Sequence, residues 1–226
     1  LSPISAPENH YFKVKANNRL DANGTLRGEL VVTAEGQSDS NVRRVFTGGW
    51  QTDWKNSMEQ QLLAISPNAK LISVDWGKNP KDYLAAPIKI TFRYEIPDYA
   101  IKGTDEWLVK PLVMNNLYNS VKSFLRINTS LAERKYGFKD ACSRLVEQVE
   151  TIQLPAGYSL VNTAKEDNSQ SKAADFEGSL KQEGNQIVLR QKLALKKRVY
   201  EASDWKGFKN AVDGFKSYGD YLVIKK

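Results

Sequence analysis

The sequence predicts an all-β protein, a large antiparallel β-sandwich of jelly-roll-like form with two short helices. Three observations lead to this fold class. Apolar and polar residues alternate with period two along much of the chain, turn sequences separate the alternating segments, and helical spacing is rare. Strands with one apolar and one polar face are typical of antiparallel sheets that bury one side. Two smaller β-sandwiches in tandem are the alternative.

The chain begins with a predicted hairpin. Residues 11–15 alternate, Asn23 and Gly24 follow, and residues 26–32 alternate again. Asn-Gly between alternating segments indicates a type I′ turn, because both central residues of that turn need positive φ. The same period predicts four further strands, over residues 88–96, 152–154, 176–180 and 187–199.

Two segments have the spacing of amphipathic helices. The first covers residues 54–65, with Thr52 or Asp53 as its N-cap, and the second covers residues 205–215.

Two other segments lack a clear period. Residues 116–150 fit a helix and a strand equally well, and the polar segment 163–174 is expected to be a mobile loop.

The charge distribution suggests a sub-boundary near residue 115. Residues 1–115 contain 14 Lys/Arg and 13 Asp/Glu, a net charge of +1, whereas residues 116–226 contain 19 and 13, a net charge of +6. We expect either one sandwich over residues 1–226 or two lobes that meet at this point. The one dense basic run, 196–198, is interpreted as part of a solvated strand face, and no nucleic-acid partner is expected.

The single histidine and the single cysteine restrict the chemistry that the chain can perform. A cysteine nucleophile needs a neighbouring base and a group that orients this base. His10 lies 132 residues before Cys142, near the start of the chain. We therefore predict no catalytic residue, no Cys/His metal site and no cofactor.

Three tryptophans in the first half are candidates for a ligand platform. Trp50, Trp54 and Trp76 lie close in sequence to Asp53 and Asp75, and aromatic faces with nearby carboxylates suit a sugar. The chain is therefore also considered as a carbohydrate-binding module. The alternative is that these tryptophans belong to the core.

No apolar run is long enough for a transmembrane helix, and the first residues do not resemble a signal peptide. We expect the chain to be a piece of a longer protein.

The order of short motifs in the C-terminal half is similar to a known family. These motifs are residues 147–158, 175–179, 184–187, 199–208 and 221–226. Together they resemble the region that follows the catalytic core in bacterial transglutaminase-like proteins of the DUF3857/DUF3858 type, with the lobe 116–226 as the DUF3858-like part. The segments 20–28 and 97–100 suit the upstream part of the same region.

The resemblance implies that the chain has a role other than catalysis. In these proteins a β-sandwich and a papain-like core precede the β-rich C-terminal region. The chain is expected to be an accessory module that packs on or presents a catalytic domain of the same protein, with a peptide or a glycan as a further ligand. A periplasmic or cell-envelope location is implied as well. Segment 136–145 resembles the nucleophile helix of the family, but no histidine follows Cys142, so this role is not transferred to it.

Overall fold

The computed structural model describes residues 5–47, 50, 53–85, 87–115, 117–118 and 120–226. Strands make up 39% and helices 22%, which confirms the predicted β class.

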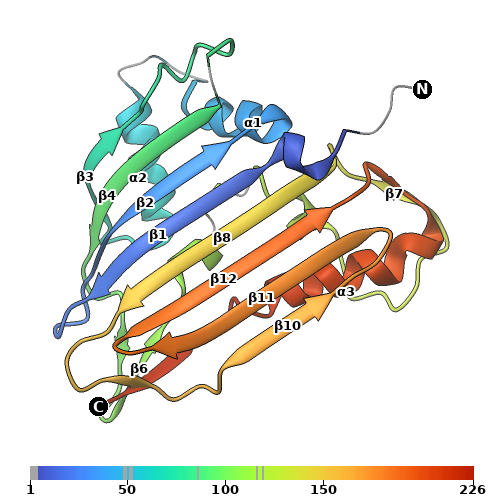
Figure 1. The fold of residues 1–226 in the computed structure, drawn as a ribbon. Helices are drawn as coiled ribbons and strands as arrows, with labels where there is room; N and C mark the ends of the chain where they lie inside the picture. The colour runs from blue at the N-terminus through green and yellow to red at the C-terminus, as the bar shows by residue number, and fades with distance from the viewer. Residues whose placement is uncertain (1–4, 48–49, 51–52, 86, 116, 119) are drawn as a thin grey trace.

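Eight strands within the described residues form one large sheet. They are β1 (Phe12–Leu20), β2 (Leu26–Ala34), β3 (Lys70–Asp75), β4 (Ile88–Ile96), β8 (Arg144–Gln153), β10 (Lys165–Ser169), β11 (Ala174–Glu183) and β12 (Gln186–Leu195). Their order across the sheet is β10-β11-β12-β8-β1-β2-β4-β3 (Figure 1). Neighbouring strands run antiparallel except β1 and β8, which run parallel with Phe12 opposite Val146. The sheet is therefore mixed, whereas the sequence predicted an antiparallel one.

The other described strands form two small sheets. One has the order β5 (Ile101–Lys102), β6 (Glu106–Val109), β14 (Leu222–Lys225) and β9 (Ser159–Leu160), and the other pairs β7 (Phe138–Lys139) with β13 (Val199–Tyr200).

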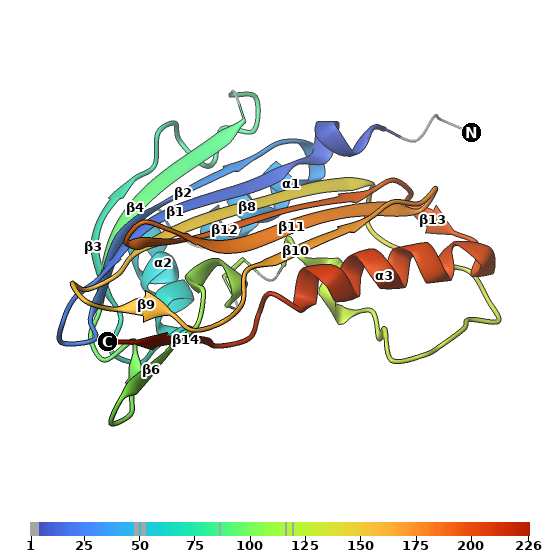
Figure 2. The same ribbon diagram turned by 60° about the horizontal axis from the view of Figure 1, so that its bottom comes forward.

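The described helices are α1 (Gly36–Thr47), α2 (Trp54–Leu63) and α3 (Trp205–Lys216), together with the 3-10 turns η1 (Pro7–His10), η3 (Leu112–Met114), η4 (Ser123–Arg126) and η5 (Ala202–Asp204). Figure 2 shows the three helices on one face of the large sheet, together with β6, β9 and β14. We call the opposite face of the large sheet the open face.

The core lies between the large sheet and the helices. Alternate residues of β1, from Phe12 to Leu20, face this layer and are buried, as the period-two pattern requires. Helix α3 packs closely on β11 because residue 214 is glycine. A Cβ at Gly214 would lie 2.6 Å from the Phe176 ring of β11.

The predicted N-terminal hairpin is confirmed, but the predicted turn type is wrong. Strands β1 and β2 pair as far as Leu20 and Leu26, so the loop is longer than two residues. Gly24 has a φ of 81°, whereas Asn23 is not among the residues with positive φ. The Asn23 side chain instead accepts a hydrogen bond from the Thr25 N–H at 3.1 Å, which forms a local Asx-type turn.

Both predicted helices are present, as α2 and α3, and Asp53 occupies the N-cap position of α2 without a side-chain cap bond. The other candidate cap, Thr52, lies outside the described residues. Helix α1 was not predicted, because its sequence is mostly polar and lacks a continuous apolar stripe.

The predicted mobile loop at 163–174 is wrong in its first part, which contains the edge strand β10. This strand is polar on both faces, so only its backbone pairing with β11 defines it. The ambiguous segment 116–150 contains the short elements η4 and β7 and then most of β8. Because β8 pairs with β1, strands from both sides of residue 115 belong to one sheet.

A buried polar network lies beneath the β1–β8 pair. Glu150 of β8 accepts hydrogen bonds from Asn18 Nδ2 at 2.7 Å and from the Val113 N–H at 3.0 Å. Tyr94 OH donates to Asn18 Oδ1 and so extends the network to β4. Burial raises the pKa of Glu150 from 4.5 to about 7, although the hydrogen bonds that it accepts oppose this. The carboxyl group therefore links three strands and the η3 turn.

We predict that Glu150 makes the folded state more stable in mild acid. The pKa of Glu150 is about 7 in the folded chain, whereas the ordinary value, which applies to the unfolded chain, is 4.5. The folded state therefore binds the proton of this carboxyl group more tightly than the unfolded state does. The contribution is full below about pH 4.5 and is lost as the pH rises through 7. The difference between the two pKa values corresponds to a change of about 3 kcal/mol in the free energy of unfolding. Urea unfolding at pH values from 4.5 to 8 measures this change.

The variant Glu150→Gln should lose this pH dependence while keeping an amide oxygen for the Val113 N–H. Glu147→Gln is the matched control, because Glu147 lies on the same strand but on the open face, where it pairs with Lys13. An unchanged pH profile in Glu150→Gln would contradict the assignment.

Candidate functional site

The single histidine and the single cysteine lie at the same end of the large sheet. His10 precedes β1 and Cys142 precedes β8, and the parallel pairing places the starts of these strands side by side. The charge of Arg144 acts on both residues. A catalytic site that uses Cys142 and His10 would have to lie at this end of the sheet. The contacts of these two side chains therefore decide whether such a site can form.

His10 caps helix α1. The Gln37 N–H donates to His10 Nδ1 at 3.1 Å, and Ser38 Oγ donates to the His10 carbonyl at 2.8 Å. Gly36 makes this approach feasible: its φ is 59°, and a Cβ there would lie 2.3 Å from the Asn9 carbonyl oxygen. Nδ1 must stay unprotonated to accept this bond. Burial lowers the pKa of His10, and the charge of Arg144 lowers it further.

Cys142 is a buried thiol. Arg144 Nη2 donates to its Sγ at 3.3 Å, and the side chain is 7% exposed. Burial raises the pKa of the thiol and outweighs the neighbouring Arg144. Since the thiolate is the nucleophilic form, this environment does not activate the sulfur.

Two buried cations belong to this region: Arg144 contacts Cys142, and Lys122 directly follows Val121, whose carbonyl Arg144 contacts. Arg144 is fully buried and donates through Nη1 to the Val121 carbonyl. Its Nε has no hydrogen-bond partner among the described residues. Lys122 is 3% exposed and donates to the Asn115 carbonyl at 3.2 Å. Burial lowers its pKa to about 8, so it is still mostly protonated at neutral pH.

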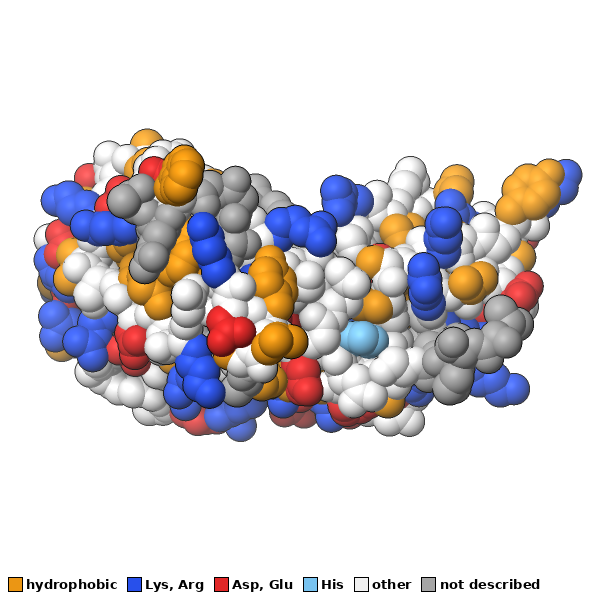
Figure 3. All heavy atoms as spheres, turned by 90° about the horizontal axis from the view of Figure 1, so that it is seen from above, with side chains coloured by type: hydrophobic (Ala, Val, Ile, Leu, Met, Phe, Trp, Pro, Cys, Tyr) orange, Lys and Arg blue, Asp and Glu red, His pale blue; other side chains and the backbone are white. Residues whose placement is uncertain are grey.

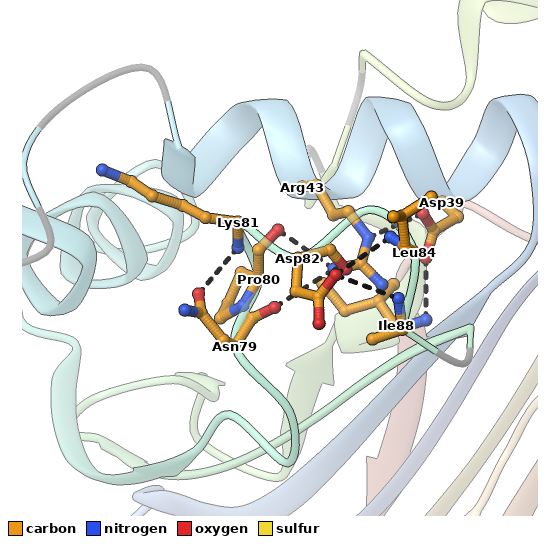
Figure 4. Close-up of polar contacts among 9 residues, drawn as sticks. Asp39, Arg43, Asn79, Pro80, Lys81, Asp82, Leu84 and Ile88 are labelled. Carbon is orange, nitrogen blue, oxygen red and sulfur yellow. Dashed lines mark hydrogen bonds and ion pairs between the residues drawn. The ribbon is translucent and has the colours of Figure 1, made fainter.

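Helix α1 carries two adjacent arginines that have different environments. Arg43 is buried: its Nε contacts Asp39 at 2.7 Å, and its Nη1 donates to the carbonyls of Pro80 and Asp82 at 3.0 Å each (Figure 4). Asp39 also accepts the Ile88 N–H at 2.7 Å. These contacts fix α1 against the 79–82 loop. Arg44 is exposed and has no ion pair or hydrogen bond with the other described residues.

Arg44 lines a groove of about 550 Å³ between α1 and the segment around η4. Figure 3 shows this end of the molecule, where a hollow separates two lobes and Lys and Arg side chains lie along its rim. The groove is lined by Gln37, Asn41, Arg44, Val45, Ser120, Ser123, Arg126 and Ala141. Ser123 Oγ is already engaged, because it donates to Asp140 Oδ1 at 2.8 Å. This groove is the site best suited to an anionic ligand.

The structure does not form the predicted platform of Trp50, Trp54 and Trp76. Trp54 is 4% exposed, and Trp76 packs edge-on against it with 5.7 Å between ring centroids. Trp76 also packs against Phe46 at 5.2 Å. Trp50 alone of the three is exposed, at 80%. The arrangement gives carbohydrate binding no support.

The groove residues were not found by the sequence reasoning. Arg44 lies in the helix that was not predicted, and Arg126 lies in the ambiguous segment. The one available signal was the i,i+4 spacing of Asp39 and Arg43, which marks a helix. The run 196–198 lies just after β12, where Lys196 pairs with Asp175 and Lys197 with Asp204, while Arg198 is exposed.

Within the described residues, no group of three or more His, Cys, Asp or Glu side chains could hold a metal ion. None of the described helices has the length and hydropathy needed to span a bilayer.

Comparisons with known proteins find a matching family model and distantly similar solved structures. Residues 105–217, half of the chain, match the family model described as "Domain of Unknown Function with solved-structure structure (DUF3858)". This confirms the predicted resemblance in that part, whereas the links to DUF3857 and to transglutaminase-like proteins stay predictions. The chain is also similar to a crystal structure of a "putative protease" from Parabacteroides distasonis, with 13% identity and a TM-score of 0.41. That match covers 47% of this chain and 21% of the other. A search of curated proteins found no match.

We predict that His10→Ala destabilises the protein by about 1 kcal/mol at pH 8, because α1 loses a cap. The folded-state pKa of His10 lies below 6.5, so the cap contributes stability above that pH and loses it as the pH falls through the folded value. The difference between wild type and variant should therefore shrink in acid, as measured by urea unfolding. Asn9→Ala, at an exposed neighbouring residue, is the control. A difference that does not change with pH would contradict the capping role.

Proposed function

Because the chain belongs to the DUF3858 family, we propose that it is a non-catalytic accessory module of a longer, transglutaminase-like protein. It packs on, orients or presents a catalytic domain that lies elsewhere in that protein. The observation that carries the non-catalytic part is the structural use of His10 and Cys142. The resemblance of residues 147–226 to the region after such a core supports the accessory part.

The geometry around Cys142 supports the absence of nucleophilic chemistry. The thiol contacts a cation that is itself buried, and the ring of His10 accepts a backbone N–H of α1. A histidine whose Nδ1 caps a helix is held by that helix, so acting as a base for the thiol would require the cap to open.

The 79–84 loop is the part of the surface that best suits contact with a catalytic domain. Arg43 holds its backbone (Figure 4), yet Tyr83 is 52% exposed and Leu84 is 99% exposed. A fully exposed leucine on a fixed loop can bury apolar area without the entropy loss of ordering a flexible one. We propose that the catalytic domain of the same protein covers this loop. On the resemblance alone, we propose a periplasmic or cell-envelope location.

The first test is an activity assay on the chain itself. We expect no amide hydrolysis or transamidation of glutamine-containing peptides beyond that of Cys142→Ala. Thiol-dependent turnover that Cys142→Ala abolishes would refute the non-catalytic assignment.

The second test uses the longer protein that the proposal requires. Leu84→Lys should weaken the contact and lower the melting temperature or the activity of the catalytic domain, because a charge would replace the buried leucine. Leu131→Lys is the matched control, since Leu131 is also exposed but lies in another loop. Equal behaviour of the two variants would exclude the 79–84 loop as the contact.

A further inference from the structure

The groove between α1 and η4 brings two arginines from separate elements to one cavity. Arg44 comes from α1 and Arg126 from η4, and both are exposed. Neither side chain has a hydrogen bond or an ion pair with another residue of the described chain. Arg27 and Arg93 differ in this respect, since they pair with Glu95 and Glu29 across the open face.

The wall behind the groove is positively charged as well. Fully buried Arg144 contacts Val121 and Cys142, and each of these residues directly adjoins a groove residue, Ser120 or Ala141. The acceptors that Arg144 contacts are a carbonyl and a thiol, both neutral, and its Nε has no partner in the described chain. A buried cation without a carboxylate partner keeps its field largely unscreened.

Lys122 is a second buried cation in a segment that lines the groove. It is buried, contacts the neutral Asn115 carbonyl, and immediately precedes the groove residue Ser123. The opposing charge is that of Asp140, which accepts hydrogen bonds from Ser123 Oγ and from the Ala141 N–H. Asp39 of α1 is already paired with Arg43. The cations around the groove therefore outnumber the unpaired carboxylates.

We propose that this groove is a binding site for a small oxyanionic ligand, whose carboxylate or phosphate group lies between Arg44 and Arg126. Guanidinium groups present planar pairs of N–H donors that match both oxyanions. Asn41 and Gln37 supply amide groups on one wall, while Val45 and Ala141 supply apolar surface for the rest of the ligand. The volume of about 550 Å³ suits a small molecule. This site does not depend on the accessory role proposed above.

The experiment titrates the chain, at constant ionic strength, with inorganic phosphate and separately with succinate. Calorimetry measures affinity, and the ¹H–¹⁵N signals of the arginine Nε–H groups show which side chains respond. We expect saturable binding of at least one anion, with shifts of two exposed arginine signals. Saturation by phosphate alone identifies a phosphate ligand, and saturation by succinate alone identifies a carboxylate ligand.

The variants Arg44→Gln and Arg126→Gln should each weaken binding by about tenfold or more, because each removes a charge-assisted hydrogen bond. Arg190→Gln is the matched control, because Arg190 is an exposed arginine on the open face. The affinity of this variant for the anion should equal that of the wild type. Thermal unfolding of each variant verifies that the variant is folded. The Nε–H signals of the wild-type protein show which arginines respond to the anion without the need for a variant. Absence of saturation by both anions, or equal affinity in all three variants, would overturn the proposal.

Discussion

Strands β1 and β8 form the parallel pair among the described strands of the large sheet, and the other parts of the molecule are arranged around this pair. The pair joins strands more than a hundred residues apart and connects the N-terminal hairpin to the C-terminal strands. Beneath the pair, Asn18 and Glu150 join the two strands through a buried hydrogen bond. At its beginning, His10 fixes the start of α1. The two titratable groups respond to pH in opposite directions, because His10 must be neutral to cap α1 whereas burial favours protonated Glu150. Glu150 therefore favours the folded state in acid and His10 favours it in neutral to basic solution, so the two contributions oppose each other as the pH changes.

The sequence predicts the strands well where burial is one-sided. Strands β1, β2, β4 and β12 alternate because one face meets the helices and the other meets water, and this difference is visible in the residues themselves. Edge strand β10 is polar on both faces, so only its pairing partner defines it, and that partner lies outside any local window. The parallel β1–β8 pair could not be predicted for the same reason, since strand direction is set by the path of the chain in space and not by the alternation of apolar and polar residues.

Buried charges explain why the candidate site could not be derived from the sequence. A local pattern assigns Arg43 and Arg44 equally to the surface, yet Arg43 is enclosed by Asp39 and the carbonyls of the 79–82 loop. Arg144 begins β8, whose burial alternates only from Val146 onward, and its own charge does not indicate full burial. Burying such a group is costly without partners, so each case depends on acceptors contributed by distant segments. These acceptors become known only with the tertiary structure.

The scarcity of histidine and cysteine takes on a different meaning once their contacts are known. His10 and Cys142 do lie at one end of the sheet, where a nucleophile and a base would meet, but each is engaged in holding the fold. Arg144 lies next to both, and its positive charge disfavours a protonated histidine while burial keeps the thiol neutral. A site that performed thiol chemistry would need the opposite, a histidine able to hold the proton and a stabilised thiolate. The charge of Arg144, which disfavours a protonated His10, suits an anion in the adjacent groove, because Arg144 is held in place before any ligand arrives. Binding then requires no reorganisation of this cation, and the two exposed arginines supply the direct contacts.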